Sequence, residues 1–183
     1  MTLNNSILVT TSEILGLEPC DDFIAIFLKH YSNFSGTIDD FLELPHITYK
    51  DKCSVYFRMV PKDIASLVVA DIAESVLHVF ESGYLDDNRP RLAIEAARGG
   101  MKGEEAAGDA SDAAYCAIHF ASHAVAAAAK SACAAAYAST YAVNTVTAYV
   151  SAATHAVEAA GNRRAQEALQ LEIMGRYLKA PTK

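Results

Sequence analysis

The sequence predicts an all-α protein: a bundle of closely packed, alanine-rich helices with shorter helices at its N-terminus. Nearly half of residues 121–160 are alanine, the residue with the highest helix propensity. Histidine aside, Lys130 is the one charged residue between Asp112 and Glu158, and no proline lies between Glu104 and Leu178. Alanine adds little bulk, so such helices hold together only where their axes approach closely.

The alanine-rich stretch must fold back on itself. A single straight helix over residues 109–160 would be about 75 Å long, whereas a chain of this size has a radius of gyration of about 16 Å. We predict a hairpin or trio of helices, with breaks at Ser139-Thr140 and at Ala129–Ser131, because serine and threonine compete for backbone hydrogen bonds. Gly161 ends the stretch, and a final amphipathic helix is expected over Arg163–Leu178.

Upstream of this stretch, apolar residues at helical spacing predict a long helix from Pro61 to about Glu81. A turn at 84–89 follows, and Pro90 opens a short helix over Arg91–Arg98. We expect residues 61–183 to form the alanine-rich bundle and residues 1–60 to form a helical segment packed on it, within one structural domain.

The N-terminal segment predicts only short elements. Residues 1–12 are expected to be irregular, and Ile47–Met59 is expected to be helical, with a strand or hairpin as the alternative. The other expected helices are Glu13–Leu17, a helix from Asp21 or Asp22 as its cap to Tyr31, and Ile38–Leu44, which Thr37 and Asp40 begin.

Charge and cysteine usage restrict the class of protein. A net charge of −7 disfavours a nucleic-acid-binding surface and suits a basic protein partner or plain solubility. Cys20, Cys53, Cys116 and Cys133 form no CxxC pair and are expected to be reduced thiols. The first residues lack the pattern of a signal peptide and the uncharged stretch is too polar for a bilayer, so we expect a cytoplasmic protein that does not contact membranes.

The segment YLDDNRPRLAIEAARGGMKGE carries a specific motif. Its turn of the form D-D-x-R-P-R and the following A-I-E-A-A-R helix, between an apolar helix and an alanine-rich run, resemble the Imm5-like family of bacterial and phage immunity proteins. The resemblance spans roughly residues 20–165. It implies an all-helical protein that neutralises a toxin or other partner by binding it, and it implies no catalytic residue.

The charged residues of this motif have two interpretations. They are Asp86, Asp87, Arg89, Arg91, Glu95 and Arg98. In the first interpretation the turn is a structural clamp that holds the long helix against the alanine core, with the arginines paired to Asp86, Asp87 and Glu95. In the second, the same residues form a charged surface that meets a protein partner.

Tyr137, Tyr141 and Tyr149 lie near one stripe of the alanine-rich stretch. Such a stripe is usually core packing, since a tyrosine ring fills space beside alanine. If the stripe is exposed, it becomes a partner-binding surface, because tyrosine is enriched at interfaces.

A metal site is the weaker interpretation of Cys116, His119 and His123, which would share one face of a single helix. His155 is the candidate for a fourth ligand. The sequence has no HExxH, G-x-S-x-G, P-loop or G-x-G-x-x-G motif. We therefore expect packed histidines and neither a metal, a cofactor nor an enzyme.

The sequence as a whole favours a non-enzymatic inhibitor that binds a protein partner, of the immunity type or a phage counter-defence protein. The acidic balance suits a basic partner such as a nuclease or a nucleic-acid-handling defence complex. Two alternatives stay open: a self-associating structural protein that forms a homodimer through its alanine faces, and a metal-dependent enzyme.

Overall fold

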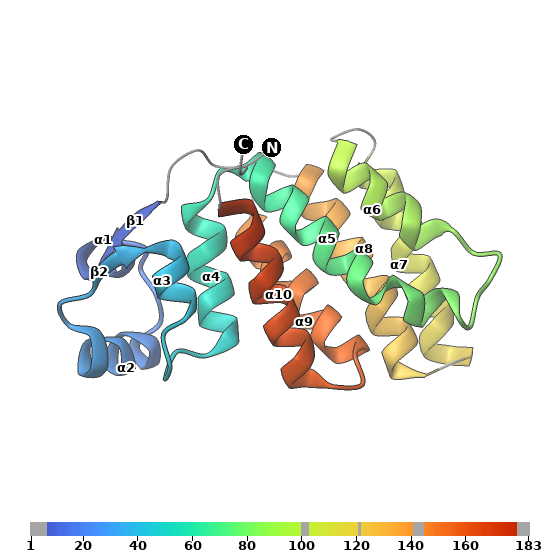
Figure 1. Ribbon diagram of the computed structural model, residues 1–183. Coiled ribbons are helices and arrows are strands. Elements are labelled where there is room, and N and C mark those ends of the chain that lie inside the picture. Colours follow the sequence, from blue (N-terminus) through green and yellow to red (C-terminus); the bar gives the residue numbers. More distant parts are fainter. Residues whose placement is uncertain (1–6, 100–102, 121, 141–144, 179–183) are drawn as a thin grey trace.

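The computed structural model describes residues 7–99, 103–120, 122–140 and 145–178. Within these ranges the chain forms ten helices and one two-stranded antiparallel sheet, which confirms the predicted all-α class (Figure 1). In chain order the elements are β1 (Leu8–Thr10), α1 (Thr11–Leu15), α2 (Asp21–Tyr31), β2 (Ser35–Thr37), α3 (Ile38–Leu42), α4 (Tyr49–Met59), α5 (Lys62–Glu81), α6 (Arg89–Gly99), α7 (Gly103–Phe120), α8 (His123–Thr140), α9 (Thr145–Ala159) and α10 (Arg163–Leu178).

Helix α8 lies at the centre of the molecule and packs against α5, α6, α7 and α9. Its alanines are buried on several sides of the helix, which only residues without bulk permit. The buried alanines are Ala126, Ala127, Ala128, Ala129, Ala132, Ala135, Ala136 and Ala138. Ser131, also fully buried, donates a hydrogen bond of 2.8 Å from its hydroxyl to the carbonyl of Ala152 in α9.

The alanine-rich stretch forms three helices, α7, α8 and α9, and one of the predicted breaks is correct. Helix α8 ends at Thr140, as expected, but Ala129–Ser131 lies inside that helix. The break that the sequence did not reveal lies between Phe120 and His123. There the Ser122 hydroxyl accepts the Val125 N–H at 3.4 Å, so a serine provides the start of α8 rather than a break within it.

The helices form two layers (Figure 1). Helices α7, α8 and α9 make one layer, and α5, α6 and α10 cover it. Helix α4 packs against α9 at one side, and the small sheet with α1–α3 lies beyond α4. The expected division near residue 60 falls between α4 and α5 and stays a prediction.

Helix α10 joins the N-terminal segment to the bundle. The Tyr56 hydroxyl of α4 donates to the carbonyl of Met174 at 3.2 Å, and the Gln170 amide donates to the carbonyl of Ala153 in α9 at 3.2 Å. These side chains are buried, so each hydrogen bond offsets a desolvation cost and fixes the position of α10.

The N-terminal segment differs from expectation at several points. Helix α1 covers Thr11–Leu15 rather than Glu13–Leu17, and α3 ends at Leu42 rather than Leu44. Residues 8–10, predicted to be irregular, form strand β1, which pairs antiparallel with β2. At Gly36 in β2 the backbone lies so close to neighbouring side chains that an added Cβ would lie 3.0 Å from Asp40 Oδ2. Helix α2 begins after Cys20, and the two aspartates expected to cap it lie in its first turn instead. There their negative charges interact favourably with the positive end of the helix dipole.

Other predictions for this segment are confirmed. Thr37 and Asp40 form a reciprocal capping box at the start of α3. The stretch expected to be helical rather than extended forms α4, with Thr48 as its cap. No helix in the described ranges has both the length and the apolar content needed to cross a bilayer.

The packing of α8 makes a testable prediction. Ala132→Leu adds bulk to a position with no exposed surface, so it should lower the free energy of unfolding by about 1–3 kcal/mol or more. Ala168→Leu, at an exposed position of α10, is the matched control and should change it by less than about 0.5 kcal/mol. Urea unfolding followed by circular dichroism measures both, and equal stability of the two variants would contradict close packing at α8.

Candidate functional site

Helices α5 and α6 form an antiparallel hairpin whose connecting loop, residues 82–88, protrudes at the edge of the molecule remote from the small sheet (Figure 1). The inner face of α6 packs on α5, α7 and α8 through Pro90, Ala93, Ile94 and Ala97, all of them buried. Small residues on this face let α6 lie close to the alanine-rich core. The rest of the D-D-x-R-P-R motif therefore lies at the surface.

Asp87 and Arg89 form an ion pair at the start of α6. Arg89 Nε and Nη2 donate to the two Asp87 carboxylate oxygens at 2.9 and 2.6 Å, and the Arg89 backbone N–H donates at 3.2 Å. The hydrogen bonds from Arg89 hold the pKa of Asp87 below its ordinary value. This pair fixes the conformation of the turn, and it is the one arginine pairing that the sequence predicted correctly.

The other two arginines bind α5 instead of the predicted Glu95. Arg91 contacts Glu81 at 2.6 Å, and Arg98 bonds to Asp71 at 2.7 Å and to Glu74. The prediction was wrong because it considered neighbours within one helix. Arg91 and Arg98 are seven residues apart, as are Glu81 and Glu74, so two antiparallel helices match them in register. The arginines therefore clamp α6 to α5.

The outward side of this hairpin carries residues that the clamp does not use. Leu92 and Glu95 lie three residues apart on one face of α6, Asn88 immediately precedes that helix, and Leu85 and Asp86 lie in the adjoining loop. All five are exposed, Leu85 by 87% and Leu92 by 46%. We call Leu85, Asp86, Asn88, Leu92 and Glu95 the α6 surface. Its two leucines were not predicted from the sequence, although their place among charged residues was a signal.

The α6 surface is acidic. Residues 71–98 carry six carboxylates and three guanidinium groups. The clamp and the turn use four of those carboxylates, and within the described ranges Asp86 and Glu95 form no ion pair. The exposed charge of this surface is therefore negative, and it surrounds two exposed leucines.

The two described tyrosines of the predicted stripe do not share one surface. Tyr137 lies on α8 and is 40% exposed, whereas Tyr149 lies on α9 and is buried. The Tyr149 hydroxyl is 3.0 Å from Ser66 Oγ and donates to the Lys62 carbonyl at 3.3 Å. Tyr149 is thus a packing residue and is excluded from any exposed binding surface. Tyr141 lies outside the described residues.

The weak metal candidates do not share one helix. Cys116 and His119 belong to α7, with side chains outside the described residues, whereas His123 is exposed at the start of α8. The break at Ser122 separates them, which the assumption of a continuous helix missed. His155, the suggested fourth ligand, lies on α9 with Nδ1 2.9 Å from Glu158. Among the described residues no three histidine, cysteine or acidic side chains form a metal-binding group.

The Asp87–Arg89 pair predicts a pH dependence. Because the pKa of Asp87 is lowered in the folded state, its stabilising contribution is present above the ordinary aspartate pKa of about 4. That contribution is lost as the pH falls through the lower folded pKa. We expect the free energy of unfolding of wild type to exceed that of Asp87→Asn by about 1 kcal/mol at neutral pH. This difference should shrink towards zero as the pH approaches about 2.

Asp86→Asn is the matched control, since the Asp86 carboxylate is exposed and unpaired within the described ranges. Denaturant unfolding at several pH values measures both variants. A wild-type advantage over Asp87→Asn that stays constant with pH would contradict the pairing.

Comparison with known proteins places the chain in a family. No curated protein and no solved structure is detectably similar to it. The family model described as Imm-5 like putative immunity protein matches residues 61–178, which contain α5–α10 and hence the whole α5–α6 hairpin. This match covers more than half of the chain, so the protein belongs to the Imm5-like immunity protein family.

Proposed function

We propose that this protein is a non-enzymatic inhibitor of the immunity type, which neutralises a toxin or a defence complex by binding it through the α6 surface. Membership of the Imm5-like family supports an immunity-type role and a protein partner. The observation that carries the choice of surface is the separation of roles on the hairpin. Its arginines bind within the chain, while Asp86, Glu95 and two leucines face outward.

The α6 surface has the chemistry of a recognition surface. Leu85 and Leu92 supply apolar area that a partner can bury, and the acidic residues around them supply charge complementarity. Because the clamp to α5 already orders α6, binding does not require this helix to be ordered first. An acidic surface with apolar anchors suits a basic partner, such as a nuclease.

The partner to test is the product of the gene adjacent to the one that encodes this chain. A bacterial culture that expresses this neighbouring protein should stop growing if it is a toxin, and co-expression of the wild-type chain should restore growth. The double charge reversal Asp86→Lys/Glu95→Lys should weaken binding by at least about tenfold, measured by isothermal titration calorimetry, because like charges then face a basic partner.

Asp112→Lys/Glu172→Lys is the matched control. It reverses one aspartate and one glutamate, both exposed, on α7 and α10. It should bind and restore growth as wild type does, and both variants should unfold at the wild-type temperature. Wild-type affinity of the Asp86→Lys/Glu95→Lys variant would exclude the α6 surface. A toxic neighbour that does not bind the wild-type chain would contradict the proposed immunity role.

A further inference from the structure

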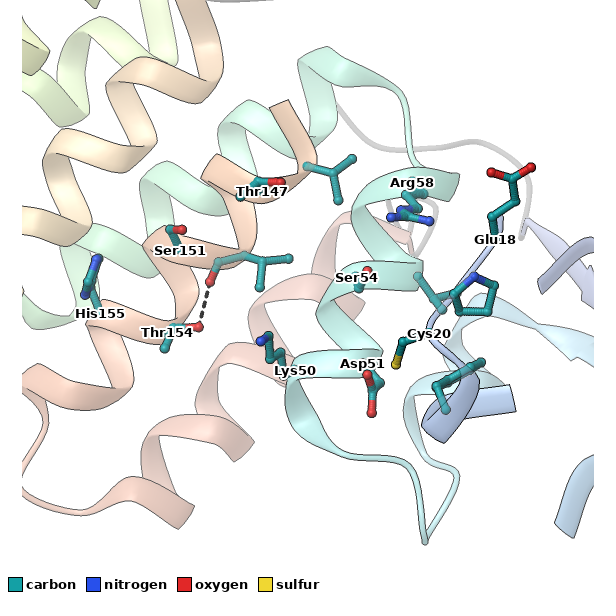
Figure 2. Close-up of a pocket in the computed structure, with 15 residues that line it drawn as sticks. Glu18, Cys20, Lys50, Asp51, Ser54, Arg58, Thr147, Ser151, Thr154 and His155 are labelled. Atoms are coloured by element: carbon teal, nitrogen blue, oxygen red, sulfur yellow. Dashed lines mark hydrogen bonds between the residues drawn. The ribbon is translucent and has the colours of Figure 1, made fainter. Parts of the chain in front are cut away.

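Two adjoining cavities lie beside α4 and α9, away from the α6 surface. The larger, of about 610 Å³, lies between α4, α9 and the segment that precedes α2 (Figure 2). The smaller, of about 470 Å³, lies where α4 begins, α9 ends and α10 begins. Lys50 and Thr154 line both cavities, so the two adjoin at these residues.

The smaller cavity is basic, although the chain as a whole is acidic. Lys50, Arg163 and Arg164 line it, with Glu167 as the one carboxylate among the described lining residues. Arg163 pairs with Glu167 at 2.8 Å. The side chains of Lys50 and Arg164 form no ion pair or hydrogen bond in the part of the chain that the structure describes. Three cations near one carboxylate leave an excess of positive charge that an anion would neutralise.

The surrounding backbone adds to this potential. The first residues of α4 and of α10 both line the smaller cavity, and both helices exceed ten residues. The N-terminal end of each helix carries partial positive charge. The cations that line the cavity remain the main source of attraction for an anion, and the helix ends reinforce it.

The larger cavity provides an apolar wall next to this charge. Phe23, Val55, Val146 and Val150 form this wall, and the charged residues Glu18, Asp51 and Arg58 line other parts of the cavity. In Figure 2 the Lys50 side chain extends from α4 into the space between α4 and α9, towards Thr154. A volume of about 610 Å³ falls within the range of small-molecule sites. Apolar surface beside a basic recess suits a molecule with an anionic group on an apolar body.

We propose that the two cavities together bind a small organic anion. Its phosphate or carboxylate group lies among Lys50, Arg163 and Arg164, and its apolar body lies against the valines and Phe23 of the larger cavity. This site is independent of the α6 surface and does not require a protein partner.

Phenyl phosphate, benzoate and inorganic phosphate are suitable probes, titrated into the full chain by isothermal titration calorimetry. Phenyl phosphate or benzoate should bind more tightly than inorganic phosphate, because only these two carry an apolar body. The tighter of the two identifies the anionic group as phosphate or carboxylate. Binding of the tighter probe should fall at least about tenfold in Lys50→Ala/Arg164→Ala.

Lys29→Ala/Arg176→Ala is the matched control, since it removes one exposed lysine and one exposed arginine that line neither cavity. It should bind the probe within about twofold of wild type. Neither side chain of the Lys50→Ala/Arg164→Ala pair contributes a hydrogen bond within the described ranges, so that variant should keep the wild-type unfolding temperature. Absence of binding by both organic probes at millimolar concentration, or an equal loss in the control, would overturn the site.

Discussion

The close packing of small residues around α8 is the constraint on which the rest of the structure depends. Alanine buries little area per residue, so this core gains its stability from many short-range contacts between backbones. Four helices approach α8, and this arrangement positions α5 and α6 side by side over the α7–α9 layer. A bulky residue at the interface would separate the layers. The position of the α6 surface therefore follows from residues that never reach the surface themselves.

Charged side chains are distributed unevenly over the bundle. Since residues 113–157 contain a single lysine as their charged residue, apart from histidines, the charges of the bundle concentrate on α5, α6, α10 and the first turns of α7. On the hairpin they pair across helices and leave an acidic remainder, whereas at the start of α10 Arg164 has no partner within the described ranges. One fold thus presents an acidic surface and a basic recess at separate places, although the net charge alone suggests only an acidic protein.

The sequence predicted elements whose signals are local. The bounds of α10 and the end of α5 follow from helical periodicity and flanking glycines, and the capping box of α3 follows from Thr37 and Asp40. The sequence did not predict features that depend on residues distant in the chain. Strands of three residues pair across more than twenty positions, Arg98 binds carboxylates on another helix, and Lys50 lines the same cavity as Arg164 only because the starts of α4 and α10 lie beside one another in the fold. Spacing within one segment contains none of this information.

The region matched by the family and the N-terminal segment contribute differently to the two sites. The α6 surface lies wholly within residues 61–178, so the bundle alone can present it. The smaller cavity combines Lys50, which precedes that region, with Arg163 and Arg164 inside it. An anion held there would bridge α4 and α10, which are already joined by the hydrogen bond between Tyr56 and Met174. Because a ligand that binds only the folded state stabilises it, such binding would strengthen the junction between the N-terminal segment and the bundle while leaving the α6 surface accessible to a partner.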